Sequence, residues 1–568
     1  MVHQRVPLII GVTGHRDLLE SERAAIEAAV VEFTSYLTER YPNLPLLFLS
    51  GIAEGADTLV ANIATRMGCQ QINVLPMPAA DYRKDFSPQG VTELDEILGR
   101  NETITLGVDS STEVNSGSEY SERELSYERL GVFLAAHCHL LLAIWDGKSA
   151  NGPGGTANVI RFHQRDLTPL AGVQEERPKL DFAEDESDLV FHIACSRKGS
   201  GPPETPLQPA QTAWVSRDDQ HPRTEALPRR YDRVFRRMAE FNQDLERAEK
   251  PGVSERLLPE SVPGRAQACC NEIQSTFGRC DVLATHYQSR TLTALRLMLI
   301  ATLAAGLAFI VYADFENQGW SIWGYFLLVG LAIACFRIAD RAGWQRKHVD
   351  YRVLAEALRV QYYWAVAGVA MNNPSRFSHD RFFNGRDLDL GWIRNVLRYT
   401  GLKSDSEQTA SAADVELAVA HWVGTEQTGQ YGYYRERASR KLKEHVQTNR
   451  LTNLCFLGGL LAASTLALAH HQLSDLAANL LVALMGVLPL LAAARQNYAH
   501  RVAQRELVAQ YAQMHQVFAF ASRFLAKTSD VKERQDLLQE LGESALQENA
   551  QWVLRQRERP LPGSEEMV

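Results

Sequence analysis

The chain of 568 residues has room for roughly three or four domains of ordinary size. Hydrophobic residues make up 45% of it and charged residues 22%, which excludes a disordered or fibrous protein. The net charge of −9 argues against a basic nucleic-acid-binding surface, so we expect no nucleic-acid polymer as a partner. Eight cysteines without a CxxC pair predict neither a disulfide framework nor a metal site. The first 25 residues do not resemble a signal peptide, so we expect a cytosolic N-terminal region.

Strand-like and helix-like patterns alternate over about the first 165 residues. Strands are predicted at Pro7–Val12, Leu46–Leu49, Gln71–Leu75 and His139–Trp145. Helices are predicted from Ser21, at Thr58–Met67 and at Ser121–Ala136. Alternation of this kind predicts an α/β domain, Rossmann-like, with a mostly parallel sheet.

Three of these strands end in glycine-rich loops, and each loop leads into a helix. In an open α/β sheet, ligands bind in the crevice at the carboxyl ends of the strands. Glycine lets backbone N–H groups approach an anion, and the start of the next helix adds favourable partial charge. The loops therefore predict a crevice for a phosphate or a nucleotide. Its candidate ligand-binding residues are Gly11, Thr13, Gly14, His15, Arg16, Gly51, Glu54, Gly55, Asp57, Trp145, Asp146, Gly147, Gly154, Gly155 and Thr156.

Residues of the first loop each have a binding and a structural interpretation. Thr13 either donates its hydroxyl to a phosphate or caps the following helix. His15 and Arg16 either contact a phosphate or pair with Asp17. We favour the ligand for Arg16, because a guanidinium beside an anion-binding loop suits bidentate recognition.

The other two loops leave similar alternatives open. Glu54 and Asp57 either stabilise a helix start as carboxylates do, or contact a ribose hydroxyl. Trp145 either stacks on a base or belongs to the core at the end of its strand. Both interpretations are kept for these residues.

Residues 166–262 contain fewer signals. A strand is predicted at Leu189–Ala194 and a charged helix at Tyr231–Glu249, with the Pro- and Gly-rich segment Gly199–Pro209 between them. We interpret this region as an extension of the α/β domain and a connector, and we assign no chemistry to it.

Four apolar stretches follow, in two closely spaced pairs: Leu297–Ala313 with Trp320–Phe336, and Leu454–Ala469 with Leu476–Ala494. Each has about the length that a helix needs to cross a bilayer, and the short gaps predict two antiparallel hairpins. The alternative is two buried hairpins of a soluble protein, since Asn479 and Pro489 interrupt the last stretch. We favour four transmembrane helices, with the lipid bilayer as a partner.

The charges around the hairpins predict their orientation. The gaps within the pairs, 314–318 and 470–475, contain no Lys or Arg, whereas the outer flanks are basic. Basic residues resist translocation, so the gaps should face outward and the N- and C-terminal regions should lie in the cytoplasm. We therefore expect a multi-pass protein of the inner (cell) membrane.

The two hairpins lie in similar surroundings, at an offset of about 155–160 residues. A helix precedes each hairpin and a long amphipathic helix follows it. The amphipathic helices should pack as a cytosolic bundle, within a chain or between chains. The predicted domains are 1–262 (the α/β domain with its extension), 263–371 and 415–545 (two helix–hairpin–helix units), 372–414 (a linker) and 546–568 (a flexible tail).

The N-terminal motifs resemble the SLOG superfamily, a Rossmann-like group that includes nucleotide-processing enzymes and nucleotide sensors. The resemblance rests on segments 11–16, 50–57, 75–78, 85–86, 145–147 and 154–156, and on Tyr82, which it adds to the candidate ligand-binding residues. The hairpin units resemble the SLATT domain, a two-transmembrane effector domain associated with SMODS and SLOG proteins. The matching residues there are His421–Val423, Gln427, Gln430, Tyr433 and Tyr434.

The resemblance implies a bacterial anti-phage membrane effector of the abortive-infection type. Its SLOG domain would sense a nucleotide second messenger, cyclic or derived from NAD or ADP-ribose, without a cofactor. The transmembrane helices of a homo-oligomer would then form a pore, such as an ion channel, or disrupt the membrane. In related cytokinin-activating enzymes a catalytic glutamate follows the PGGxGT motif, but after Pro153–Thr156 this chain has no carboxylate through Ile160. That departure favours a receptor over an enzyme; a membrane-anchored nucleotide or NAD hydrolase and a constitutive scaffold remain the alternatives.

Overall fold

The computed structural model describes residues 5–106, 121–150, 152–164, 188–217, 222–247, 256–258, 265–314, 319–369, 390–402, 410–469 and 472–557. The chain forms two compact units. Unit 1 comprises Met1–Pro251, Glu260–Thr276 and Trp364–Ala410, and unit 2 comprises Gly252–Pro259, Phe277–Tyr363 and Ser411–Val568.

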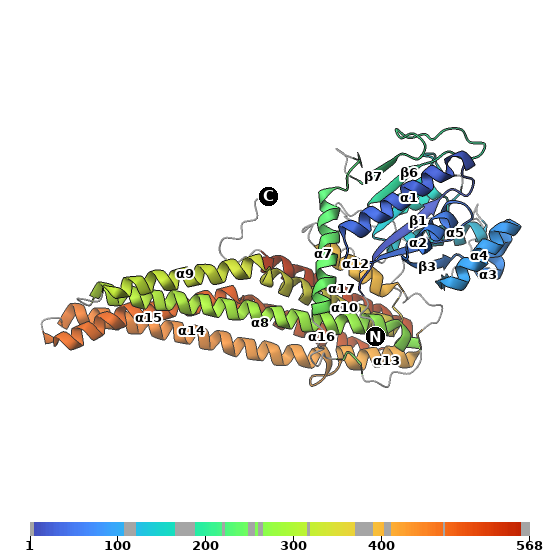
Figure 1. Cartoon of the computed structure of the whole chain (residues 1–568). Coiled ribbons are helices and arrows are strands. Elements are labelled where there is room, and N and C mark those ends of the chain that lie inside the picture. The colour runs from blue at the N-terminus through green and yellow to red at the C-terminus, as the bar shows by residue number, and fades with distance from the viewer. Residues whose placement is uncertain are drawn as a thin grey trace. The chain divides into compact units, whose positions relative to one another are not determined.

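Unit 1 is built on one eight-stranded sheet with the strand order β4-β3-β2-β1-β5-β6-β7-β8. Figure 1 shows strands of this sheet, among them β1 and β6, with helices such as α1 and α2 packed on it. The pairings from β4 through β6 are parallel, and β7 and β8 are added antiparallel. The strands are β1 (Leu8–Gly14), β2 (Leu46–Ser50), β3 (Gln70–Leu75), β4 (Glu102–Thr105), β5 (Leu140–Trp145), β6 (Val190–Ala194), β7 (Thr212–Val215) and β8 (Arg223–Thr224).

The central strands are buried on both faces, as is typical of a parallel sheet. Every residue of β2 and β6 is buried, so helices cover both faces of the sheet. The helices of unit 1 that alternate with these strands are α1 (Glu20–Arg40), α2 (Ala56–Arg66), α3 (Ala79–Tyr82), η1 (Arg83–Asp85), α4 (Pro88–Arg100), α5 (Glu122–His137), α6 (Thr156–His163) and α7 (Arg229–Arg247). The predicted α/β class with a mostly parallel sheet is confirmed.

A further helix of unit 1, α12 (Gly391–Gly401), comes from a distant part of the chain. All its residues are buried, and it packs against α7 and α5. The side chain of Trp392 contacts Phe241 at 5.2 Å between ring centroids, and Arg398 donates a hydrogen bond of 3.1 Å to the Cys138 carbonyl. The segment 372–414 that contains this helix was predicted to be a linker, but the apolar residues of α12 are buried in the core of unit 1.

Unit 2 is helical. Its elements are α8 (Arg265–Asp314, which begins in the part assigned to unit 1), α9 (Trp320–Arg341), α10 (Trp344–Ala367, with its last residues in unit 1), α13 (Ala412–Ala418), the π-helical turn η3 (Val419–Val423), α14 (Gly429–Ala469), α15 (Asp475–Arg501), α16 (Gln504–Leu525) and α17 (Val531–Arg557). The last of these is a regular helix through Arg557, so part of the segment predicted as a flexible tail is helical.

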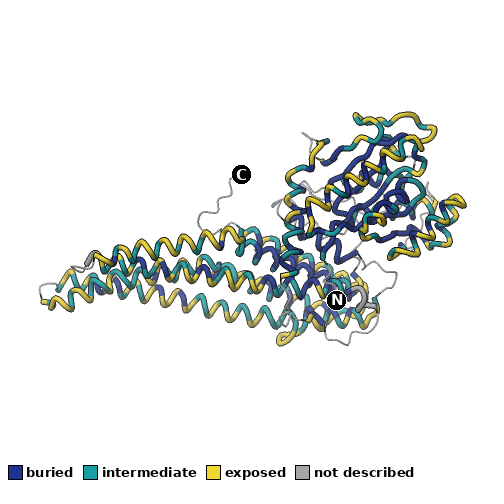
Figure 2. The backbone as a smooth tube through the Cα atoms, viewed as in Figure 1, coloured by how far each residue is buried: buried dark blue, intermediate teal, exposed yellow. Residues whose placement is uncertain are grey.

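Four helical segments of the described chain are long and apolar enough to cross a membrane: Cys270–Tyr312, Trp320–Ala367, Gly429–Ala469 and Asp475–Leu525. They form the two hairpins that the sequence predicts. Exposed and intermediate residues alternate along them in Figure 2, and Trp323 and Leu327 of α9 are both 75% exposed. Apolar side chains left uncovered over such lengths need lipid around them rather than water.

Small residues bring these helices into close contact. A Cβ added to Gly306 of α8 would lie 2.7 Å from Leu490 of α15, and one on Gly459 of α14 would lie 2.9 Å from Pro489. On Gly486 of α15 it would lie 3.1 Å from Ile310 of α8. Small residues at such crossings are typical of membrane helices, because they allow backbones to approach closely.

The two hairpins end in the same way. Between α9 and α10, Gly343 has a φ of +62°, and between α15 and α16 Ala503 has a φ of +53°. The two breaks are 160 positions apart, in agreement with the offset of the sequence repeat. An alanine rarely adopts this left-handed conformation, so its presence at the equivalent place is consistent with a duplicated unit.

Candidate functional site

A cleft of about 460 Å³ opens at the carboxyl end of the sheet in unit 1. It lies where the strand order reverses, because β1 pairs with β2 on one side and with β5 on the other. Ligands of open α/β sheets bind at this switch point. Of the residues predicted from the sequence, those that line the cleft are Thr13, Gly14, His15, Arg16, Asp57, Tyr82, Gly154, Gly155 and Thr156.

The loops after β1 and β2 are held against each other by backbone contacts. The N–H of Ala56 donates to the carbonyl of His15 at 3.1 Å, and Gly55 takes a φ of +101°. A Cβ on Gly55 would lie 2.4 Å from the Arg16 carbonyl oxygen, so only glycine fits there. One on Gly14 would lie 2.4 Å from the Ala56 Cβ. These glycines therefore close the loops together and bring the start of α2 to the cleft.

The loop after β5 forms the opposite wall. Gly154 approaches α5 so closely that an added Cβ would lie 2.4 Å from the Cβ of Tyr127. Gly155 is the N-cap of α6, and Thr156 is the first residue of that helix. The amino ends of α2 and α6 both border the cleft, and the exposed N–H groups of a helix start favour an anion.

Arg16 is the cation best placed to meet a ligand. Its guanidinium donates to the Tyr127 hydroxyl at 3.2 Å and lies 5.4 Å from the centre of that ring. Asp17 instead pairs with Arg197 at 2.9 Å, which excludes the alternative that Asp17 neutralises Arg16. Among the described residues no carboxylate forms an ion pair with Arg16, so its charge is available to an anion in the cleft.

His15 lies on the cleft wall with Asp146 behind it. The His15 Nε2 atom is 2.9 Å from the Asp146 Oδ1 atom, and the Asp146 side chain is 1% exposed. Burial lowers the pKa of His15, although Asp146 acts in the opposite direction. Burial thus favours the neutral form of the ring, and Asp146, which does not border the cleft, fixes its orientation.

Asp57 is a carboxyl group buried at the floor of the cleft. It accepts a hydrogen bond of 3.3 Å from the N–H of Ala53, and burial raises the pKa of Asp57 to about 7. Next to it Tyr82 donates to the Gly51 carbonyl at 2.9 Å, which fixes this hydroxyl in the core. The floor of the cleft therefore contains a carboxyl group, Asp57, that can change its protonation near neutral pH, and a hydroxyl group, Tyr82, that a hydrogen bond holds in place.

The other predicted residues lie outside the cleft lining. Glu54 accepts hydrogen bonds from the Ser87 hydroxyl at 2.6 Å and from its N–H at 3.1 Å, so it binds at the start of α4. These bonds lower the pKa of Glu54. The Trp145 indole donates to the Lys148 carbonyl at 2.9 Å and does not border the cleft. The glycines outside the lining, which position backbone or pack against neighbouring elements, are Gly11, Gly51, Gly55 and Gly147.

Several residues that line the cleft are not among those predicted from the sequence, and the polar ones include Tyr127, Lys148 and Arg197. Lys148 directly follows Gly147, so its place in a predicted loop could have identified it. Tyr127 lies within a predicted helix, and the sequence contains no such signal for it. Arg197 follows β6 in a region without motifs, and only the pairing of β5 with β6 brings it to the cleft. Among the described residues no group of His, Cys, Asp or Glu is arranged to hold a metal ion.

The chemistry of the cleft suits a phosphorylated ligand. Two helix starts, the guanidinium of Arg16 and the backbone of three loops supply donors, while Tyr127 offers a ring face. Comparison with known proteins adds nothing to this picture, because no family model and no curated protein matches the chain.

Proposed function

We propose that this protein is a ligand-gated membrane effector, of the anti-phage type that its resemblance to SLOG and SLATT proteins implies. A nucleotide second messenger, cyclic or derived from NAD or ADP-ribose, binds the cleft of unit 1. Binding changes how several chains associate, and the four apolar helices of each chain then form a pore or disrupt the bilayer. A ligand can act in this way only if it binds one association state more tightly than the other.

The observation that carries the proposal is the position of Arg16. Among the described residues no carboxylate forms an ion pair with its guanidinium, which stands exposed beside two helix starts at the switch point of a parallel sheet. A phosphate oxygen in the cleft can therefore accept a charge-assisted hydrogen bond from it. The same chain has four helices apolar enough to cross a membrane, which supports an effect at the bilayer.

Replacing Arg16 by glutamine should weaken nucleotide binding by about tenfold or more, since a charge-assisted hydrogen bond is lost. The measurement is the unfolding midpoint of the full chain in detergent, titrated with ADP-ribose, NAD and cyclic dinucleotides, because a ligand that binds the folded state raises this midpoint. Dye release from liposomes that contain the protein measures whether nucleotide binding makes the bilayer leak.

Arg23→Gln is the matched control. Arg23 lies on α1, faces solvent beside Glu27 and does not line the cleft. This variant should bind nucleotide as tightly as the unaltered chain and release as much dye from liposomes. A leak that no nucleotide of the panel changes, together with equal midpoints for both variants, would contradict the proposal.

The orientation of the hairpins is a separate prediction of the same proposal. The outer end of the first hairpin carries exposed aromatic residues, among them Trp320 and Trp323, as expected for the boundary between lipid and water. A cysteine at Ser474, the N-cap of α15, should react with a membrane-impermeant maleimide added outside intact cells. A cysteine at Ser439 of α14 should react only after the cells are opened. The reverse pattern would overturn the orientation.

A hydrolase remains the second candidate because of Asp57. A carboxyl group with a pKa of about 7 can donate or accept a proton near neutral pH, and this one lines the cleft. Incubating the full chain with each nucleotide and analysing what is recovered separates the two functions. Intact nucleotide that still protects the protein identifies a receptor.

A further inference from the structure

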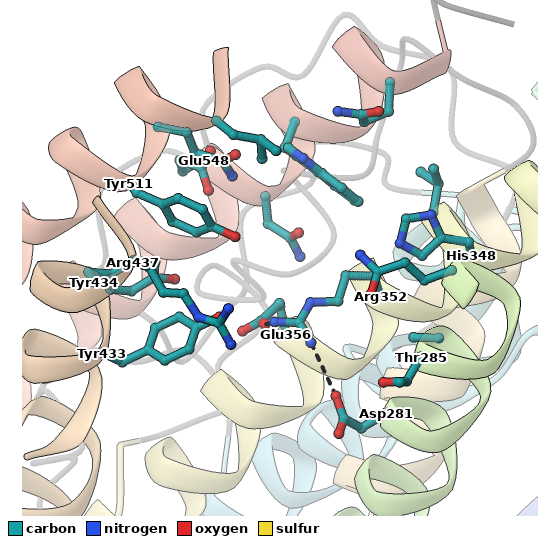
Figure 3. A pocket seen from close by; sticks show the side chains of 18 of the residues that line it. Asp281, Thr285, His348, Arg352, Glu356, Tyr433, Tyr434, Arg437, Tyr511 and Glu548 are labelled. Atoms are coloured by element: carbon teal, nitrogen blue, oxygen red, sulfur yellow. Dashed lines mark hydrogen bonds and ion pairs between the residues drawn. The ribbon is translucent and has the colours of Figure 1, made fainter. Parts of the chain in front are cut away.

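A second and larger cavity lies inside unit 2, well apart in sequence from the cleft residues. It has a volume of about 980 Å³ and is enclosed by α8, α10, α14, α16 and α17 (Figure 3). Its wall runs from Tyr363 and Trp422 to Arg296, which directly precedes the apolar stretch of α8. Pockets that hold organic ligands have volumes of about 300–1,000 Å³, so this one can hold more than a few waters.

Cationic side chains outnumber carboxylates in the wall, seven to four. The cations are Arg256, Arg296, Arg352, Arg359, Arg437, Lys441 and Arg501, and the carboxylates are Asp281, Glu356, Glu444 and Glu548. Burial, with repulsion from Glu356, raises the pKa of Glu548 to about 7, so this group carries only part of its charge at neutral pH. The described wall therefore has an excess of positive charge.

Ion pairs within the wall account for the other three carboxylates. Arg352 lies 3.1 Å from Asp281 and 2.5 Å from Glu356, and Arg359 is 2.5 Å from the second oxygen of Glu356. Lys441 pairs with Glu444 at 2.8 Å. Three of the acidic groups are thus compensated by cations of the wall itself, so the donors that matter for a ligand are cations outside these ion pairs.

Arg437 is the clearest of these donors. It lies over the ring of Tyr433, 5.2 Å from the ring centre, and no described carboxylate forms an ion pair with it. Figure 3 shows Arg437 and Tyr433 on α14 and Arg352 on α10 extending toward the same space. Tyr511 of α16 borders that space as well. Arginine and tyrosine from three helices therefore surround one volume.

We propose that this cavity is an anion site of unit 2, which binds a phosphate-bearing ligand through Arg437 and the tyrosines around it. Guanidinium groups form paired hydrogen bonds with phosphate oxygens, and phenol hydroxyls add donors of the same kind. The phosphate belongs either to a soluble organic phosphate or to the headgroup of an anionic phospholipid, since the wall reaches Arg296 beside the apolar stretch. The site is independent of the cleft and of the messenger proposed for it.

Two probes distinguish the sources. Pyrophosphate is titrated into the full chain in detergent, and the chain is separately placed in nanodiscs of phosphatidylglycerol or phosphatidylcholine. A soluble ligand is indicated if pyrophosphate slows hydrogen–deuterium exchange in α10 and α14. A lipid headgroup is indicated if only phosphatidylglycerol does so. Absence of protection in all conditions overturns the proposal.

Variants then place the effect at the cavity. Arg437→Gln should lower the apparent affinity of the protecting probe by about tenfold, and Arg437→Lys should restore part of it. Arg435→Gln is the matched control, because Arg435 lies two residues away, is 54% exposed and pairs with Glu426 outside the cavity. Equal losses in the Arg437 and Arg435 variants would overturn the proposal. So would loss of protection in Arg16→Gln, which would assign the signal to the cleft.

Discussion

Gly154→Ala should destabilise unit 1 by about 1–3 kcal/mol and open the cleft, because the added methyl group has no room. Its Cβ would lie 2.4 Å from the Tyr127 Cβ and 2.7 Å from the Tyr127 backbone carbon. Neither atom can rotate away, so the loop that carries Gly154 has to move off α5. Faster hydrogen–deuterium exchange in α5 and α6 of the full chain would report this, and the response to nucleotide should weaken with it.

The same loop contains its own control. Gly152 has no atom within 4 Å of an added Cβ, so Gly152→Ala should leave exchange and nucleotide response unchanged. If both alanine variants behaved alike, the close contact between Gly154 and Tyr127 would not be what holds the cleft wall.

Asp57→Asn should stabilise unit 1 at pH 8 by up to about 4 kcal/mol and give no gain at pH 4. Burial raises the pKa of Asp57 from 3.8 to about 7, so the folded state binds this proton more tightly than the unfolded state does. The stability of the unaltered protein therefore falls as the pH rises from about 4 to about 7, where the carboxyl group must ionise inside the fold. An amide has no such cost above pH 7.

Exchange of the β1 and β2 amides in the full chain, followed from pH 4 to pH 8, measures this effect. Asp95→Asn is the control, because the Asp95 side chain is 48% exposed. Its exchange should follow that of the unaltered chain at every pH. Lower stability of Asp57→Asn at both ends of the range would show that the hydrogen bond from Ala53 outweighs the cost of burying charge.

Local patterns predicted the strands of unit 1 that border the cleft. β1, β2 and β5 are apolar runs followed by glycine-containing loops, and both features lie within a few residues of each other. The four apolar helices could be predicted equally well from the sequence, because length and composition define them. By contrast, β7 and β8 are short and the buried position of α12 depends on contacts with α5 and α7, which no local pattern contains.

The same distinction applies within the cleft. The position of Arg16 followed from its loop, but its freedom from Asp17 depends on Arg197, which lies 180 residues further along the chain. Trp145 was a candidate either for base stacking or for the core, and the hydrogen bond from its indole to Lys148 is not visible in the sequence. Glu54 was a candidate either for stabilising a helix start or for contacting a ribose, and the helix start that it binds is that of α4, through Ser87. Loops could be predicted from sequence, whereas partners across the fold could not.

The glycine contacts between the apolar helices predict that a leak needs more than one copy of the chain. Around Gly306, Gly459 and Gly486 the helices of one chain pack so closely that an added methyl group would fit only if neighbouring side chains moved. A hydrated ion is far wider than a methyl group, so its route would run along the boundary between copies. Dye release should then grow faster than linearly with the protein-to-lipid ratio, and vesicles holding a single copy should stay sealed at saturating messenger.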